Sequence, residues 1–195
     1  MNRLDQQIAF IVEIDKLKHI YRQSYITGGT RNETDAEHSW HMAVMAILLA
    51  EHVEGYKVDV LKVIKMLLIH DIVEIDAGDT YCYDALARQS QAQREQAAAD
   101  RLFGILPENQ MNEFRALWEE FESMTTPEAR FAAALDRLQP LLLQYHTEGK
   151  SWQEHDVVSA KVKERNQHIK HISQALAELV EQIIEDSVQK GYLQK

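Results

Sequence analysis

The chain contains few of the residues that cross-link a fold or interrupt its helices. Its 195 residues include one cysteine, three prolines and seven glycines. A single cysteine, Cys82, excludes an internal disulfide and favours a reducing, cytoplasmic setting. So few prolines and glycines leave little turn chemistry for many short strands, which favours an all-α fold. A chain of this length can bury one good-sized core, so we predict a single domain over residues 1–195.

A basic surface and a long apolar run are also missing. The formal net charge is −10, from 21 lysines and arginines against 31 aspartates and glutamates. This balance excludes a broad nucleic-acid interface, which needs cations to displace phosphate counterions. It allows a small phosphorylated substrate, because one arginine and a metal ion outweigh the global field locally. The longest apolar run, residues 43–50, is too short to span a bilayer, and the first residues lack a signal-peptide layout, so no membrane partner is expected.

Apolar residues recur at helical spacing along most of the chain. Thr34, Asp35 and Asp59 are candidate N-caps, and Gly78 is a candidate helix end. A kink is expected at Pro140, inside an otherwise apolar helical pattern. The pattern predicts helices over residues 4–20, 36–52, 59–71, 84–101, 128–145 and 159–190, another helix beginning with Pro107, and links over 23–31 and 147–152.

The dipeptide His70-Asp71 closes an apolar run over residues 63–69. An imidazole and a carboxylate are costly to bury there unless something pairs with them. A divalent metal ion pairs with both, because imidazole nitrogen and carboxylate oxygen are metal donors. Adjacent helical residues point about 100° apart, so further ligands must come from neighbouring helices. His38 and Asp136 are the candidates, each on an expected helix.

Each candidate ligand also has a simpler explanation. His70 fits a hydrogen-bonded core histidine, His38 fits a helix start, and Asp136 fits an ion pair with Arg137 or Arg130. Taken together, ligand types within several apolar helical faces favour a metal centre. Four protein ligands leave open positions if the ion is five- or six-coordinate, which favours Mn²⁺, Co²⁺, Ni²⁺, Mg²⁺ or expanded Zn²⁺.

The set Glu37-His38, His70-Asp71 and Asp136 resembles the H…HD…D signature of the HD-domain metal-dependent phosphohydrolases. The resemblance implies an all-α helical bundle in which His38, His70, Asp71 and Asp136 bind one divalent ion. It also implies a homodimer that hydrolyses (deoxy)nucleoside 5′-monophosphates. The similarity to the branch containing bacterial 5′-deoxynucleotidases is carried by residues 36–43 and 69–80, within a matching region of about 17–145.

The resemblance implies further roles around the metal centre. Arg22 matches an arginine at the end of the first helix that contacts the substrate phosphate. Glu74 matches a proton-handling glutamate three residues after Asp71, and both Glu74 and Asp71 are predicted to be catalytic. Asp79 matches a further acid that binds substrate. The deoxynucleotidases have a tryptophan after that arginine, tied to their selection of deoxy sugars. Gln23 stands there in this chain, so it is a candidate sugar contact and 2′-deoxy selectivity is not implied.

Several alternatives stay open on residues alone. Arg22 also fits a cation at a helix C-terminus, and Glu74 also fits a carboxylate that supports a ligand histidine. A phosphodiesterase or nucleotide polyphosphate hydrolase would need a second ligand set, and a non-catalytic metal- or nucleotide-binding module would need the metal alone. An apolar stripe in the last expected helix fits either a dimer contact or packing within the chain, through Ile172, Leu176, Leu179, Ile183 and Ile184.

Overall fold

Most of the chain is helical, as the composition predicts. The computed structural model describes residues 2–83 and 86–195. In chain order its α-helices and strands are α1 (Arg3–Ile14), β1 (Tyr21–Tyr25), β2 (Asn32–Thr34), α2 (Asp35–Leu49), α3 (Val60–Ile69), α4 (Glu74–Ala77), α5 (Gln91–Phe103), α6 (Glu108–Ser123), α7 (Pro127–His146), α8 (Lys150–Glu154), α9 (Ser159–Asn166) and α10 (Gln174–Gln189). Short 3₁₀ segments lie at Asp15–His19, Ala50–His52, His70–Val73, Ala87–Ser90 and Ile169–His171.

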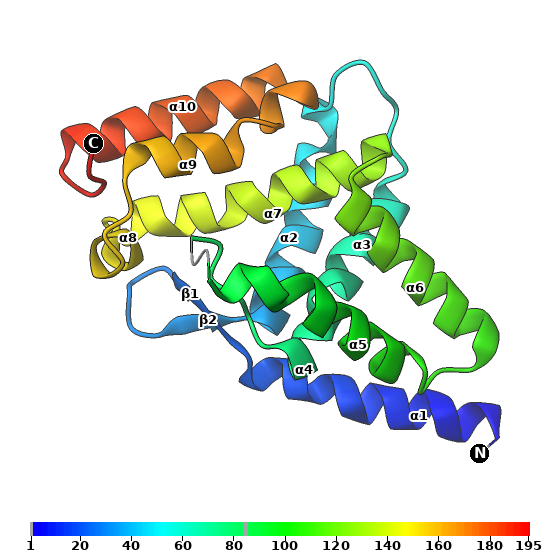
Figure 1. Cartoon of the computed structure of the whole chain (residues 1–195). Coiled ribbons are helices and arrows are strands. Elements are labelled where there is room, and N and C mark those ends of the chain that lie inside the picture. Colours follow the sequence, from blue (N-terminus) through cyan, green and yellow to red (C-terminus); the bar gives the residue numbers. More distant parts are fainter. Residues whose placement is uncertain (1, 84–85) are drawn as a thin grey trace.

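Helix α7 crosses the middle of the molecule and contacts α2, α3, α6, α9 and α10 (Figure 1). It begins at Pro127, where Thr126 accepts a hydrogen bond from the Ala129 amide at 3.2 Å. Phe131, Leu135 and Leu138 from this helix are fully buried in one continuous hydrophobic core. Asp136 therefore lies on the central helix, close to side chains from several neighbours.

Two of the predicted N-caps set the start of the helices around the site. Thr34 Oγ1 accepts from the Glu37 amide at 3.3 Å, and Glu37 Oε2 accepts from the Thr34 amide at 3.0 Å. This capping box satisfies two otherwise unpaired amides of α2 and places His38 in its first turn. Asp59 caps α3 in the same way through the Lys62 amide. Gly78 ends α4 with φ of 74°, as expected.

The predicted single helix over 4–20 and the predicted loop over 23–31 are wrong. Helix α1 ends at Ile14, a 3₁₀ segment follows, and β1 pairs antiparallel with β2. Arg22 and Gln23 therefore lie on a strand and not at a helix end. The hairpin closes through the Ile26 amide on Arg31 O, with Gly28 and Gly29 at positive φ.

The predicted helix over 159–190 is also wrong. Helix α9 ends at Asn166, and Ser173 begins α10 by accepting from the Leu176 amide. Ile169 and Ile172 lie between the two helices, and both side chains are buried in the core. Their burial fixes the position of the segment that separates α9 from α10. The expected link over 147–152 contains the start of α8. Helices α9 and α10 lie on one side of α7, and α1 lies on the opposite side (Figure 1).

The apolar stripe of this C-terminal region packs within the chain. Ile172, Leu176, Ile183 and Ile184 are buried, and Leu179 is 38 % exposed. The stripe is therefore not a free dimer surface.

Two other helix starts differ from expectation. The helix expected at 84–101 begins at Gln91 and buries Ala98, Ala99 and Leu102, while residues 84 and 85 lie outside the described residues. Pro107 is the N-cap of α6 and not its first residue. Within the described residues, no helix combines the length and the apolar character needed to cross a bilayer.

Candidate metal centre and its cavity

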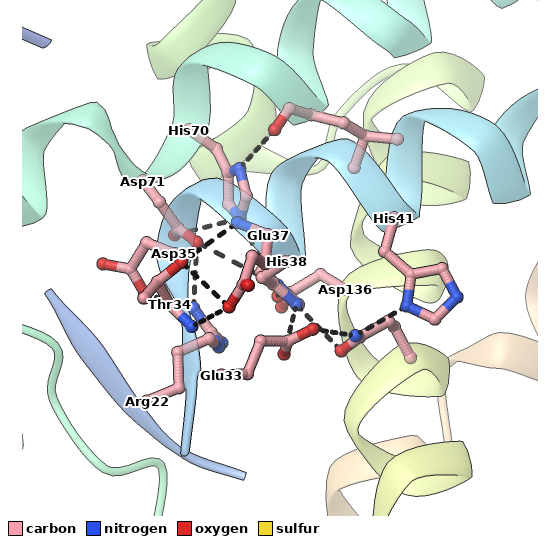
Figure 2. Close-up of polar contacts among 12 residues, drawn as sticks. Arg22, Glu33, Thr34, Asp35, Glu37, His38, His41, His70, Asp71 and Asp136 are labelled. Atoms are coloured by element: carbon pink, nitrogen blue, oxygen red, sulfur yellow. Dashed lines mark hydrogen bonds and ion pairs between the residues drawn. The ribbon is translucent and has the colours of Figure 1, made fainter. Parts of the chain in front are cut away.

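The four predicted metal ligands converge from three parts of the chain (Figure 2). His38 comes from α2, His70 and Asp71 from the 3₁₀ segment after α3, and Asp136 from α7. His38 Nε2 lies 3.2 Å from Asp136 Oδ1 and 4.0 Å from Asp71 Oδ2. His70 Nε2 lies 2.9 Å from Asp71 Oδ1 and 3.8 Å from Asp136 Oδ1. Two imidazoles and two carboxylates thus meet at one point in the protein interior.

Hydrogen bonds on the far side of each ring determine which nitrogen faces this point. His70 Nδ1 lies 2.9 Å from the Leu67 carbonyl oxygen, which can only accept, so Nδ1 carries the hydrogen. His38 Nδ1 lies 2.8 Å from Gln139 Oε1 and is a donor for the same reason. In the neutral rings both Nε2 lone pairs therefore face the two carboxylates.

This arrangement fits a divalent cation. Lone pairs aimed at carboxylates repel unless a positive charge lies between them, and His70 Nε2 is buried with no hydrogen-bond partner among the residues that the structure describes. Burial lowers the pKa of His70, but Asp71 and Asp136 outweigh burial and raise it to about 10. The same pocket that attracts a proton attracts a metal ion, since metal ligands bind in their deprotonated forms. His38, His70 and Asp71 offer donor atoms close enough to share one ion.

Gln139 is a site residue that the sequence analysis missed. It is fully buried, accepts from His38, and donates to Glu33 Oε1 at 2.7 Å and to His41 Nδ1 at 3.1 Å. These bonds set the orientation of the amide and, through it, the His38 tautomer. A signal existed, because Gln139 follows Asp136 by three residues and so shares its helix face. Figure 2 labels Glu33, His38 and His41, the three residues to which Gln139 bonds.

Replacing Gln139 by leucine is expected to weaken Mn²⁺ binding by roughly 10- to 100-fold, the usual effect of losing the partner that orients a metal-binding histidine. The Glu33 carboxylate would also lose its buried donor, at a cost of about 1–3 kcal/mol in unfolding free energy. Mn²⁺ titration and denaturant unfolding measure the two effects. The control is Gln110→Leu, which removes a similar bond to Gln7 on another helix. Unchanged Mn²⁺ affinity in folded Gln139→Leu would show that the His38 tautomer does not depend on Gln139.

Arg22 lies beside the centre, buried among acids. Its Nη1 donates to Asp71 Oδ2 at 2.9 Å and to Asp35 Oδ1 at 3.2 Å, and its side chain is 12 % exposed. Asp35, Asp71 and Glu74 form a second cluster of acids close enough to hold a cation. The Arg22 guanidinium already supplies positive charge to two of them, so the mixed His/Asp set is the better candidate for the ion.

Glu74 and Asp79 line the same side of the site. Burial, together with Asp71 and Asp35, raises the pKa of Glu74 well above its ordinary range. Burial also raises the pKa of Asp79, although Arg22 opposes it. The alternative role of Glu74 as the support of a ligand histidine is wrong, because His70 donates to Leu67 and His38 to Gln139.

A cavity of about 250 Å³ opens onto these residues. It brings together Arg22, Gln23, Asp71, Glu74, Asp79 and Asp136, the predicted catalytic and substrate residues, with His70. Gln23 Oε1 lies 3.2 Å from His155 Nε2. Among the residues that the structure describes, the wall also contains buried polar atoms without a hydrogen-bond partner, including Gln144 Oε1 and Asn166 Oδ1. Unpaired groups of this kind in a cavity wall are available to a polar ligand.

The alternative explanation for Asp136, an ion pair with Arg137 or Arg130, names the wrong arginines. Asp136 makes no ion pair with Arg137 or Arg130 in the described residues, and its Oδ2 lies 3.8 Å from Arg165 Nη2. Arg130 bonds to the Met124 carbonyl and Arg137 to the Met124 sulfur. Arg165, on α9, is a second neighbour of the centre for which the sequence offered no signal.

The helical bundle and its buried His/Asp centre define a candidate metalloprotein of the α-helical class. Residues 14–177 match the family model described as HD domain, and the chain belongs to that family. A solved structure from Magnetospirillum magnetotacticum MS-1 is described as a predicted metal-dependent phosphohydrolase and is 50% identical to this chain. The match spans 99% of this chain and 96% of that protein's chain, with a TM-score of 0.94. The PH0347 protein of Pyrococcus horikoshii OT3, 24% identical with a TM-score of 0.65 and covering 94% and 99%, shows the fold alone.

Curated relatives include proteins named 5′-deoxynucleotidase HDDC2. The Xenopus laevis protein is 32% identical over 69% of this chain and 66% of its own length. The Homo sapiens protein is 27% identical over 69% of this chain and 65% of its own length. The chain thus spans slightly less than two thirds of these relatives.

Proposed function

We propose that this protein is a cytoplasmic, metal-dependent 5′-nucleotidase that hydrolyses (deoxy)nucleoside 5′-monophosphates to nucleoside and phosphate. The observation that carries the proposal is the convergence of two Nε2 lone pairs and two carboxylates beside Arg22, next to a cavity that His70, Asp71 and Asp136 line. The names of the curated relatives and of the Magnetospirillum structure support phosphoryl chemistry.

The proposed ligands are His38, His70, Asp71 and Asp136, holding one divalent ion. When bound, such an ion supplies Lewis acidity: it acidifies water and withdraws charge from phosphoryl oxygens. Arg22 offers guanidinium donors to the phosphate, and Asp71 holds Arg22 in place through its outer oxygen. Gln23, Asp79 and the unpaired wall atoms are proposed to contact the nucleoside.

Glu74 is proposed to protonate the leaving 5′-oxygen. A carboxyl whose pKa lies well above its ordinary range is more readily protonated than a free glutamate and can release that proton to a developing alkoxide. Glu74→Gln is therefore expected to lower kcat on the order of 10²-fold while Mn²⁺ affinity is retained. Steady-state kinetics and Mn²⁺ titration on the same preparation separate the two effects. Lost Mn²⁺ affinity would instead assign Glu74 to the metal, and unchanged kcat would remove it from the reaction.

The direct test of the proposed function is phosphate release from nucleoside mono-, di- and triphosphates, each as ribose and 2′-deoxyribose forms, with Mn²⁺, Co²⁺ or Mg²⁺. Turnover of monophosphates in preference to the others is expected. Turnover confined to phosphodiesters or triphosphates would favour the alternative hydrolases. No turnover by metal-loaded protein would favour a binding module. The ratio of ribose to deoxyribose rates reports on the sugar preference that Gln23 leaves open.

We also propose a homodimer through an exposed apolar face on α2. Trp40, Ile47 and Leu48 are 65%, 62% and 63% exposed, at spacings that put them on one side of the helix. Ile47→Glu is expected to yield monomers in light scattering after gel filtration. The control is Lys161→Glu, at an exposed position of α9. A wild-type monomer at micromolar concentration would contradict the dimer.

A further inference from the structure

The outer oxygens of the two site carboxylates face two different arginines. Asp71 Oδ1 lies against His70 and its Oδ2 against Arg22 Nη1 at 2.9 Å. Asp136 Oδ1 lies against His38, and its Oδ2 lies 3.8 Å from Arg165 Nη2. Each carboxylate therefore has a histidine on its inner oxygen and an arginine on its outer one.

The two arginines differ in how far their donors are used. Arg22 makes two hydrogen bonds to acids, whereas Arg165 makes none within the described residues and has the single long ion pair to Asp136. The Arg165 side chain is 29% exposed and lines the cavity. A guanidinium carries five N–H donors, and leaving them unused in a partly buried wall is unfavourable unless an anion binds them.

The neighbouring arginine on the same wall is placed differently with respect to the site carboxylates. Arg137 also lines the cavity, but one of its donors bonds to the Met124 sulfur and, among the described residues, it forms no ion pair with Asp136. Arg165 comes from α9, which lies outside the region that carries the metal-ligand signature. Within the described part of the chain, Arg165 is the cavity arginine that forms an ion pair with Asp136, and no hydrogen bond uses its donors.

We propose that Arg165 binds the phosphoryl group of the substrate as a second guanidinium beside Arg22. This inference rests on the proposed function and adds a residue to its site. Two arginines together spread the charge of a phosphate dianion over more donors than one arginine can. The C-terminal segment, by way of α9, then takes part in substrate binding.

Inorganic phosphate is the probe, because its binding needs no turnover of a nucleotide. Equilibrium dialysis of labelled phosphate against Mn²⁺-saturated protein gives its Kd for wild type, Arg165→Gln, Arg165→Lys and Lys163→Gln. Arg165→Gln is expected to bind phosphate about 10- to 100-fold more weakly, the factor for one lost charge-assisted hydrogen-bonding group. Arg165→Lys should fall between it and wild type. Lys163→Gln, an equal charge loss on an exposed position of α9, should match wild type.

Mn²⁺ affinity, measured separately, distinguishes phosphate binding from a positioning role. If Arg165 only orients Asp136, Arg165→Gln would weaken Mn²⁺ binding and leave the phosphate Kd of saturated protein unchanged, and the proposal fails. If Arg165 binds phosphate, removing its positive charge should leave Mn²⁺ affinity equal or tighter. Should Arg165→Gln fail to fold, Arg165→Lys carries the test, and a wild-type phosphate Kd in that variant overturns the proposal. Absence of phosphate binding by Mn²⁺-loaded wild type would count against the proposed phosphohydrolase itself.

Discussion

Replacing Asp71 by asparagine is expected to lower phosphate release about 10³-fold and to weaken Mn²⁺ binding sharply. Asp71 contacts both His70 Nε2 and Arg22 Nη1, so the change removes a charged metal ligand and the anchor of the phosphate-binding arginine together. A metal ion supplies several kcal/mol of transition-state stabilisation, and about 4 kcal/mol corresponds to the stated factor. Malachite-green assays at saturating and limiting Mn²⁺ measure the loss.

The control for this variant is Asp76→Asn, five residues along the chain. Asp76 lies outside the cavity, where it pairs with Arg101 in a half-exposed salt bridge. Such pairs contribute about 0–1 kcal/mol to stability, so this variant should keep wild-type activity. An Asp71→Asn protein that retains a tenth or more of the wild-type rate would show that Asp71 is not a ligand of the reactive ion.

Replacing Arg22 by glutamine is expected to cost about 3–5 kcal/mol in unfolding free energy in the presence of EDTA, as for a broken buried ion pair. Arg22 is the shared partner of Asp35 and Asp71. Asp35 is fully buried, and burial and the Asp71 charge raise its pKa to about 7 even with Arg22 beside it. Without Arg22 the cluster of acids has lost the positive charge that Asp35, Asp71 and Glu74 share.

A second substitution tests this cause directly. Arg22→Gln/Asp35→Asn removes one acid along with the arginine and should recover a large part of the lost stability. Added Mn²⁺ should also stabilise the single variant by mass action, provided it still binds the ion. Urea unfolding with EDTA and with Mn²⁺ gives both numbers. If the double variant is no more stable than Arg22→Gln, the loss comes from packing and not from uncompensated charge.

Local chemistry explains which parts of this fold could be predicted. The caps Thr34 and Asp59 are read from side chains that bond within one turn, so the starts of α2 and α3 were predictable. His70-Asp71 and Asp136 were found because a ligand type within an apolar helical run needs an explanation. That these ligands meet at one point depends on the tertiary structure. The family resemblance implied this convergence, and the structure describes it.

The missed features depend on contacts between distant residues. The hairpin at β1 and β2 is held by pairing of Tyr21 with Thr34, which periodicity within either strand does not reveal. The break after α9 lacks glycine and proline, and Ser173 was the one local signal. The spacing from Asp136 places Gln139 on the ligand face of its helix, but its bond to His38 on α2 is a contact between distant residues. The same holds for the contact of Arg165 with Asp136, for which α9 itself carries no signal.

Metal reconstitution shows whether one bound ion is what makes this protein a phosphohydrolase. Protein stripped with EDTA is titrated with Mn²⁺ while bound ion per chain and phosphate release from a deoxynucleoside 5′-monophosphate are measured together. Stripped protein is expected to release no phosphate, and release should rise in proportion to bound ion until one ion is bound per chain. Asp71→Asn is expected to lose both signals. Full turnover by stripped protein, or saturation with Mn²⁺ without turnover of that substrate, would contradict the proposed metal-dependent activity.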